Sequence, residues 1–169
     1  MASRLILIAA AALLGACAHT SGGPSASAQL QPTTGNSANG SARFVQAGGK
    51  VMVSGEVRGL KPNAEHGFHV HEKGDCSSGD GMSAGGHFNP TGAPHGNHAM
   101  GMHHTGDLPS LKADAHGVAR FSFESSTIAV GSGVTDIAGK GLIVHRDADD
   151  YKTQPTGNAG PRLACAVIK

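Results

Sequence analysis

Short runs of alternating apolar and polar residues, each bounded by turn residues, recur along this chain and constrain its fold more than any other feature. Successive side chains of a strand point to opposite faces, so alternation indicates a strand with one buried face. We expect strands at 44–45, 50–57, 67–72, 118–123, 141–145 and 163–168, with a hairpin turn at Gly48-Gly49 between the first two. Repeated short strands with turn signals predict an all-β fold, an antiparallel sandwich or barrel.

The composition agrees with this fold class and excludes some functions. The chain of 169 residues has 26 Gly, no Trp, five Phe and one Tyr, which is typical of a turn-rich β protein with a light aliphatic core. Its length predicts one domain with a short appendage. The 13 Lys and Arg residues nearly balance the 12 Asp and Glu residues, so we expect no binding to nucleic acid or to an anionic membrane surface.

The N-terminal segment is typical of export. Arg4 precedes an apolar run over 5–14, which is too short to span a bilayer as a folded helix. We expect a signal peptide at 1–16, a flexible tether at 17–39 rich in Ser, Gly, Ala, Thr and Pro, and the domain at 40–169. The sequence before Cys17 resembles a lipoprotein cleavage site, so Cys17 is the predicted lipidation site and the only predicted link to a membrane.

Two other kinds of processing remain open. Ordinary cleavage at the small residues around Cys17, or at Ala26-Ser27-Ala28, would release a soluble exported form, and an uncleaved segment would leave an anchor. All three place the domain outside the cytoplasm, in the periplasm. With Cys17 lipidated, Cys76 and Cys165 form the remaining pair, and an oxidising compartment favours a disulfide between them.

Histidine is the unusual residue of this chain, with 11 copies, most of them between His66 and His104. His69 and His71 stand two apart in an expected strand, so their imidazoles project from the same face. Paired imidazoles suit a transition metal. The long segment 74–109 has no periodicity, and a loop of that length needs a metal or a disulfide to order it.

Five segments, in order from about residue 40 to the end of the chain, resemble the signature segments of copper–zinc superoxide dismutases. They are residues 67–72 (Gly-Phe-His-Val-His-Glu), 85–90 (Gly-Gly-His-Phe-Asn-Pro), 106–108 (Gly-Asp-Leu), 144–145 (Val-His) and 157–165 (Gly-Asn-Ala-Gly-Pro-Arg-Leu-Ala-Cys). The segment between Cys76 and His87 is longer than in the eukaryotic branch and resembles the bacterial, exported one. The resemblance implies an eight-stranded Greek-key β-barrel or sandwich of immunoglobulin-like type, with long metal-binding loops.

The resemblance also implies the ligands of two metals, copper and zinc. The implied copper ligands are His69, His71, His87 and His145, and the implied zinc ligands are His87, His95, His104 and Asp107. His87 is then shared, with one ring nitrogen toward each ion. The division suits the metals, because zinc favours a closed tetrahedral set of imidazoles and a carboxylate, whereas copper suits imidazoles with an open position.

Several histidines beside these ligands have competing interpretations. His103 directly precedes His104, and the spacing to Asp107 favours His104 as the ligand. His98, Met100 and Met102 are either ordinary loop residues or an auxiliary copper-loading patch, since thioethers suit copper(I). The remaining histidines, His19, His66 and His116, are interpreted as tether, structural or exposed residues.

Two charged residues have roles implied by the resemblance. Asp149 matches a carboxylate that hydrogen-bonds His69 and His95 and fixes their orientation, with Asp150 as the competing candidate. Arg162 matches an arginine beside the copper that attracts and orients superoxide, and Thr156 is a candidate for narrowing the channel. The segment 146–156 holds one Lys, so assistance from lysines is in doubt.

The implied function is superoxide dismutation, an antioxidant activity of the cell envelope. Two superoxide anions and two protons become O2 and H2O2 by Cu(II)/Cu(I) cycling, with Arg162 and His87 as catalytic residues. The alternative is an exported copper and zinc buffer without turnover; a zinc hydrolase is a distant third, because four protein ligands leave no position on zinc for water. The oligomeric state is left open between a monomer and a homodimer.

Overall fold

The computed structural model describes residues 23–169, and in this range the chain is built from strands and loops. A single turn of 3-10 helix, η1 (Met82–Ala84), is the one helical element among the described residues. The strands are β1 (Ser25–Pro32), β2 (Asn39–Ala47), β3 (Lys50–Arg58), β4 (Glu65–His66), β5 (Phe68–His71), β6 (Leu111–Lys112), β7 (Ala119–Ser125), β8 (Gly141–His145) and β9 (Arg162–Val167). The predicted all-β fold is confirmed.

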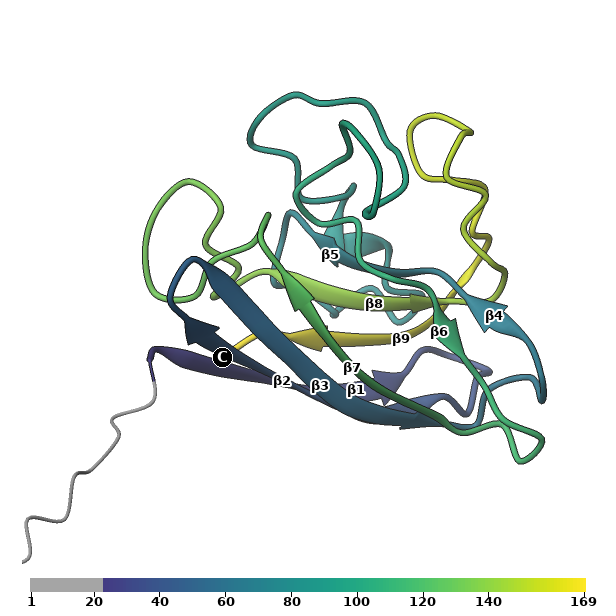
Figure 1. The fold of residues 1–169 in the computed structure, drawn as a ribbon. Helices are drawn as coiled ribbons and strands as arrows, with labels where there is room; N and C mark the ends of the chain where they lie inside the picture. Colours follow the sequence, from purple (N-terminus) through teal and green to yellow (C-terminus); the bar gives the residue numbers. More distant parts are fainter. Residues whose placement is uncertain (1–22) are drawn as a thin grey trace, which may run out of the picture.

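The strands form one curled antiparallel sheet with a short second one beside it (Figure 1). The larger sheet has the order β5-β8-β9-β1-β2-β3-β7, and β4 pairs with β6. Only Gly67 separates β4 from β5, so the two act as one edge strand, and β6 lies beside β7 at the other edge. Counted in this way, the described residues give the eight antiparallel strands of a Greek-key barrel, as the family resemblance implied.

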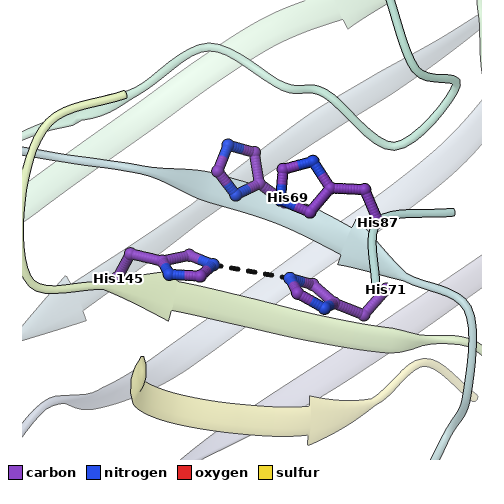
Figure 2. Close-up of side chains that lie close together, drawn as sticks. All are labelled: His69, His71, His87 and His145. Carbon is purple, nitrogen blue, oxygen red and sulfur yellow. Dashed lines mark hydrogen bonds between the residues drawn. The ribbon is translucent and has the colours of Figure 1, made fainter. Parts of the chain in front are cut away.

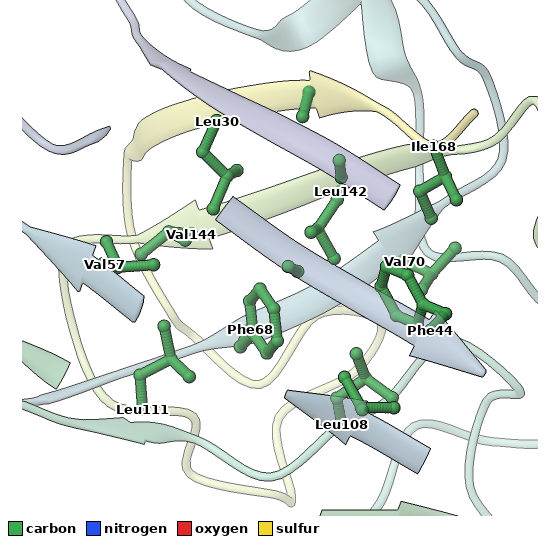
Figure 3. Packing of buried hydrophobic residues seen from close by; sticks show 14 of the residues in the cluster. Leu30, Phe44, Val57, Phe68, Val70, Leu108, Leu111, Leu142, Val144 and Ile168 are labelled. Atoms are coloured by element: carbon green, nitrogen blue, oxygen red, sulfur yellow. The ribbon is translucent and has the colours of Figure 1, made fainter. Parts of the chain in front are cut away.

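The interior of the barrel is filled by aliphatic side chains with few aromatic rings (Figure 3). Alternate residues of β3, Val51, Val53 and Val57, are fully buried, while Phe68 and Phe121 meet with ring centroids 5.3 Å apart. The expected turn between β2 and β3 falls at Gly48, whose φ of 59° suits glycine. The core therefore holds together the strand ends from which the functional loops leave.

The predicted tether is wrong over part of its length. Residues 25–32 form β1, which pairs with β2 along its length and with β9 at its end. Ala26, Ala28 and Leu30 point into the core, and the residues between them are exposed. The period of two was present in the sequence, but the Ser- and Ala-rich composition concealed it, because such small residues have little strand preference of their own.

The expected disulfide joins Cys76 to Cys165 across 89 residues, with their Cα atoms 5.9 Å apart. It ties the loop after β5 to the last strand, β9. The predicted signal peptide at 1–16, the lipidation site Cys17 and His19 lie outside the described residues. Within the described part of the chain, no helix has the length and apolar character needed to cross a membrane.

Candidate metal centre

Strand β5 places the first two histidines of the site and also holds the loops that bring the others. Val70 is buried in the core, so His69 and His71, on either side of it, face the opposite way. The main chain of Val70 receives a hydrogen bond from Phe88 and donates one to Gly106. Isolated bridges consequently pair His71 with His87 and His69 with Asp107, although these partners come from distant parts of a long loop.

Glycine is required where the loop approaches this strand. A Cβ atom on Gly106 would lie 2.2 Å from the carbonyl oxygen of Val70, so a larger residue would push the loop that carries Asp107 away from β5. His145 arrives from β8, the partner strand of β5. The register between β8 and β9 shifts between Val144 and His145, and such an irregularity re-aims a side chain.

Seven side chains converge into two sets of four that share His87. The all-histidine set consists of His69, His71, His87 and His145, and the mixed set consists of His87, His95, His104 and Asp107. Within each set the ligand atoms lie within 4.8 Å of one another, and every member is buried. Figure 2 shows the all-histidine set, in which the Nε2 atoms of His71 and His145 lie 3.4 Å apart.

The hydrogen bonds of the rings decide which nitrogen is free to bind an ion. His71 and His145 both donate from Nδ1 to a main-chain carbonyl, of Gly85 at 2.9 Å and of Gly160 at 3.0 Å. Their Nε2 atoms are thus left with a lone pair that points toward the other rings. His69 has the opposite arrangement, with its Nε2 bound to Asp149 at 2.7 Å and its Nδ1 free.

Five buried imidazole nitrogens among the described residues have no hydrogen-bond partner, and three of them belong to the two sets: Nδ1 of His69, Nε2 of His87 and Nδ1 of His95. The other two, Nε2 of His66 and Nδ1 of His98, lie outside the sets. Buried polar atoms are normally paired. The Nδ1 of His95 lies 3.0 Å from a carboxylate oxygen of Asp107 without hydrogen-bond geometry, as expected when two atoms point at a common ion. The donor types fit a copper ion in the all-histidine set and a zinc ion in the mixed set.

Asp149 connects the two sets. One oxygen, Oδ2, lies 2.7 Å from His69 Nε2, and the other, Oδ1, lies 2.9 Å from His95 Nε2. Oδ1 also accepts a hydrogen bond from the main chain of Tyr151 at 2.7 Å. The competing candidate, Asp150, is exposed, and its side chain bonds only within its own turn, to residues such as Thr153.

Burial keeps three rings of the all-histidine set neutral, those of His69, His71 and His145. It lowers the pKa of His69 to about 4, although the hydrogen bond to Asp149 acts against this shift. Burial likewise holds the pKa of His71 and of His145 well below 6.5. A neutral imidazole is the form that binds a metal, so these rings are ready as ligands over the physiological pH range.

For the mixed set, the carboxylates of Asp107 and Asp149 have the larger influence on protonation. Burial would lower the pKa of His95, but its close contacts with the carboxylates of Asp107 and Asp149 outweigh burial and raise the pKa to about 9. Burial would raise the pKa of the Asp107 carboxyl, yet the adjacent rings of His87 and His95 hold it well below its usual value. The metal-free mixed set therefore favours a cation, a proton or a metal ion.

Arg162 lines a cleft of about 480 Å³ that also reaches His145 and Thr156. Its guanidinium donates to the carbonyls of Gly81 and Gly85, each at 2.6 Å. Burial lowers the pKa of this arginine, and the nearby carboxylate of Asp80 acts against the shift. Arginine remains charged in proteins, so the cleft carries a fixed positive group beside the all-histidine set.

The remaining candidates lie outside both sets. His103 is half-buried and donates from Nδ1 to the carbonyl of His104, and His98 packs edge-on against Tyr151. His116 is exposed. His66 is fully buried, with its Nδ1 bound to the carbonyl of His145, which bears out a structural role.

Sequence reasoning missed the groups that act through the main chain. The carbonyls of Gly85 and Gly160 orient two of the rings, and no side chain identifies them. Gln154 was also missed, although its amide accepts from the His95 N–H and donates to the His95 carbonyl, both at 2.9 Å. A glutamine in a surface turn gives no signal in the sequence.

Comparison with known proteins gives consistent matches. The family model described as copper/zinc superoxide dismutase matches residues 38–168. A protein named Superoxide dismutase [Cu-Zn] from Paramecium bursaria Chlorella virus 1 is 45% identical over 135 residues, covering 76% of this chain and 71% of the relative. Another of that name from Saccharomyces cerevisiae is 42% identical over 138 residues, covering 77% and 88%.

The fold has a counterpart among solved structures as well. The crystal structure of the clock protein EA4 superposes with a TM-score of 0.78 at 40% sequence identity, covering 86% of this chain and 94% of the other. Both the strands and the loops that carry the ligand sets fall within the range of the family match.

Proposed function

Because the chain belongs to the copper/zinc superoxide dismutase family, we propose that its all-histidine set holds copper and its mixed set holds zinc. The enzyme converts two superoxide anions and two protons into O2 and H2O2. When bound, copper supplies the one-electron exchange, since it cycles between Cu(II) and Cu(I). Zinc has no redox chemistry and prefers a closed set of four ligands, which suits the mixed set.

His87 is the residue that we expect to handle a proton during turnover. Its Nδ1 faces Asp107 at 2.8 Å and His104 at 3.3 Å, while its buried Nε2 faces the all-histidine set without a partner. The ring can act as an imidazolate only between two positive ions. A free Nε2 would accept a proton and hold it on the side of the ring that faces His69, His71 and His145.

Arg162 draws the substrate inward and orients it. The two carbonyl contacts hold its guanidinium in the cleft, so the positive charge cannot swing away into solvent. A small anion is attracted by such a focused field, and the attraction weakens as salt screens it. Thr156 lines the same cleft and narrows the path to His145.

The single observation that carries this proposal is the sharing of His87 between two buried ligand sets. The decisive experiment compares superoxide turnover by the metal-loaded chain with that of His145→Ala, using His116→Ala as a matched control on an exposed histidine. Turnover is expected in the wild type and the control and not in His145→Ala. A wild type as inactive as His145→Ala would favour the metal-buffer alternative instead.

The place of action is the cell envelope, as in the bacterial exported branch. The N-terminal sequence supports export, with a lipid on Cys17 as its anchor. The disulfide supports it too, because such bonds persist in oxidising compartments. Mass spectrometry of the mature chain tests the proposal: a lipidated N-terminal Cys17 is expected, and an unmodified terminus beyond Ala28 would contradict the anchor. Light scattering on the same material decides between monomer and homodimer.

A further inference from the structure

All four methionines in the described part of the chain are exposed, whereas methionine is usually a core residue. Met52 lies on the outer face of β3 and Met82 lines the cleft beside Arg162. Met100 and Met102 stand two apart in one loop, with 71% and 74% of their surface exposed. Neither thioether of this pair is needed for the core, so we asked what chemistry the pair can perform.

The loop that carries this pair is short and closed at its base. The main-chain carbonyl of Met102 lies so near Gly96 that a Cβ there would be 2.6 Å from it. At the tip, the N–H of Met100 donates to the carbonyl of Asn97 at 2.9 Å, and Gly101 adopts a φ of 64°. A short loop that is closed at its base limits where its side chains can go, so bringing both thioethers to one ion costs less conformational entropy than it would in a long loop.

His103 adds a nitrogen ligand to the two sulfurs. Its Nδ1 lies 2.7 Å from the carbonyl of His104 and must donate to it, so the neutral ring keeps its lone pair on Nε2. Met102 and His103 line a common cleft of about 530 Å³ together with Thr127, and Met100 lies on the exposed loop outside this lining, two residues before Met102. No carboxylate lines this cleft, and a set of soft thioethers with one imidazole selects monovalent copper over zinc or calcium.

We propose that Met100, Met102 and His103 form an accessory Cu(I)-binding site at the outer edge of the loop between His95 and His104. The inference rests on the proposed function, in that a copper enzyme outside the cytoplasm must capture its metal there. The site is separate from the bimetal centre but adjoins it, since His104 of the mixed set directly follows His103. His98 is not included, because its ring packs against Tyr151 and its unpartnered Nδ1 is buried, whereas the two thioethers are exposed.

The test uses the mature chain already loaded with copper and zinc, reduced and kept free of oxygen. Cu(I) is added against a chromogenic Cu(I) chelator, and the methionine methyl groups are followed by carbon-13 NMR. We expect retention of one further Cu(I) per chain and shifts of the Met100 and Met102 methyl signals, with those of Met52 and Met82 unchanged. No additional copper, or equal shifts at all four methyl groups, would overturn the proposal.

Variants assign the ligands. The double variant Met100→Leu with Met102→Leu, and His103→Gln alone, are expected to lose the additional Cu(I), whereas His98→Gln keeps it. Retention by the double variant, or loss in His98→Gln with retention in His103→Gln, would contradict the assignment. The double variant should still dismutate superoxide at the wild-type rate, so a failure of the accessory site is distinguishable from a failure of the bimetal centre.

Discussion

Replacing Asp149 by Asn is the most informative single change, because this carboxylate supports one ligand in each set. Its two oxygens accept from His69 and His95 at 2.7 and 2.9 Å, and both bonds are buried. An amide of the same shape offers one oxygen and one NH2 group. It can accept from one imidazole, and it presents a donor to the other, whose N–H is then unpaired or must move to the nitrogen that binds the ion.

The size of the effect follows from the number of bonds lost. Mutation of a partner that orients a metal ligand typically lowers metal affinity about 10- to 100-fold, or about 1.4 to 2.8 kcal/mol for each metal. Since Asp149 serves both sets, the affinity for copper and the affinity for zinc should both fall within that range. Zinc should be lost first to a chelator, because nitrogen ligands hold zinc less tightly than copper(II).

The assay is competition with a chromogenic chelator, read separately for copper and zinc, on the wild type, Asp149→Asn and Asp150→Asn. Asp150 is exposed and contacts only its own turn, so its variant should bind both metals like the wild type. Wild-type affinities in Asp149→Asn, or equal losses in the two variants, would refute the reasoning.

Three further predictions concern other contacts. Arg162→Ala should lower kcat/KM for superoxide about tenfold and flatten its dependence on salt, measured by pulse radiolysis; an unchanged salt dependence would contradict the steering role. Replacing both Cys76 and Cys165 by Ser opens a link across 89 residues and should lower the free energy of unfolding of the metal-free chain by about 4 kcal/mol, measured by urea denaturation. A loss below about 1 kcal/mol would show that the disulfide contributes little to stability. Gln154→Ala removes both contacts to the main chain of His95 and should speed zinc release several-fold. When Co(II) replaces zinc, the variant should also show an altered visible spectrum. An unchanged release rate and spectrum would assign Gln154 no positioning role.

The metal-binding side chains could be predicted from sequence, because the chemistry of the site depends on their identity. His69 and His71 stand two residues apart in a segment that the sequence predicts to be a strand, and both lie in β5. The distant His145 was identified only through a resemblance, since nothing local in the sequence says that β8 pairs with β5.

The parts that could not be predicted depend on the main chain or on tertiary contacts. Strand β1 is stabilised by pairing with β2 and by Leu30 in the core, and its Ser- and Ala-rich sequence alone indicated a tether. Arg162 was identified from the sequence, but the carbonyls of Gly81 and Gly85 that hold its guanidinium were not, because main-chain groups leave no pattern of residue types. Orientation by main-chain groups is visible only once the loops are folded.

Anomalous diffraction from crystals of the metal-loaded chain would show whether two unlike ions share His87. Data on either side of the copper and zinc absorption edges should give a copper peak enclosed by the all-histidine set and a zinc peak enclosed by the mixed set, with the ring of His87 between them. A single peak, or two peaks that do not both contact His87, would rule out a shared histidine.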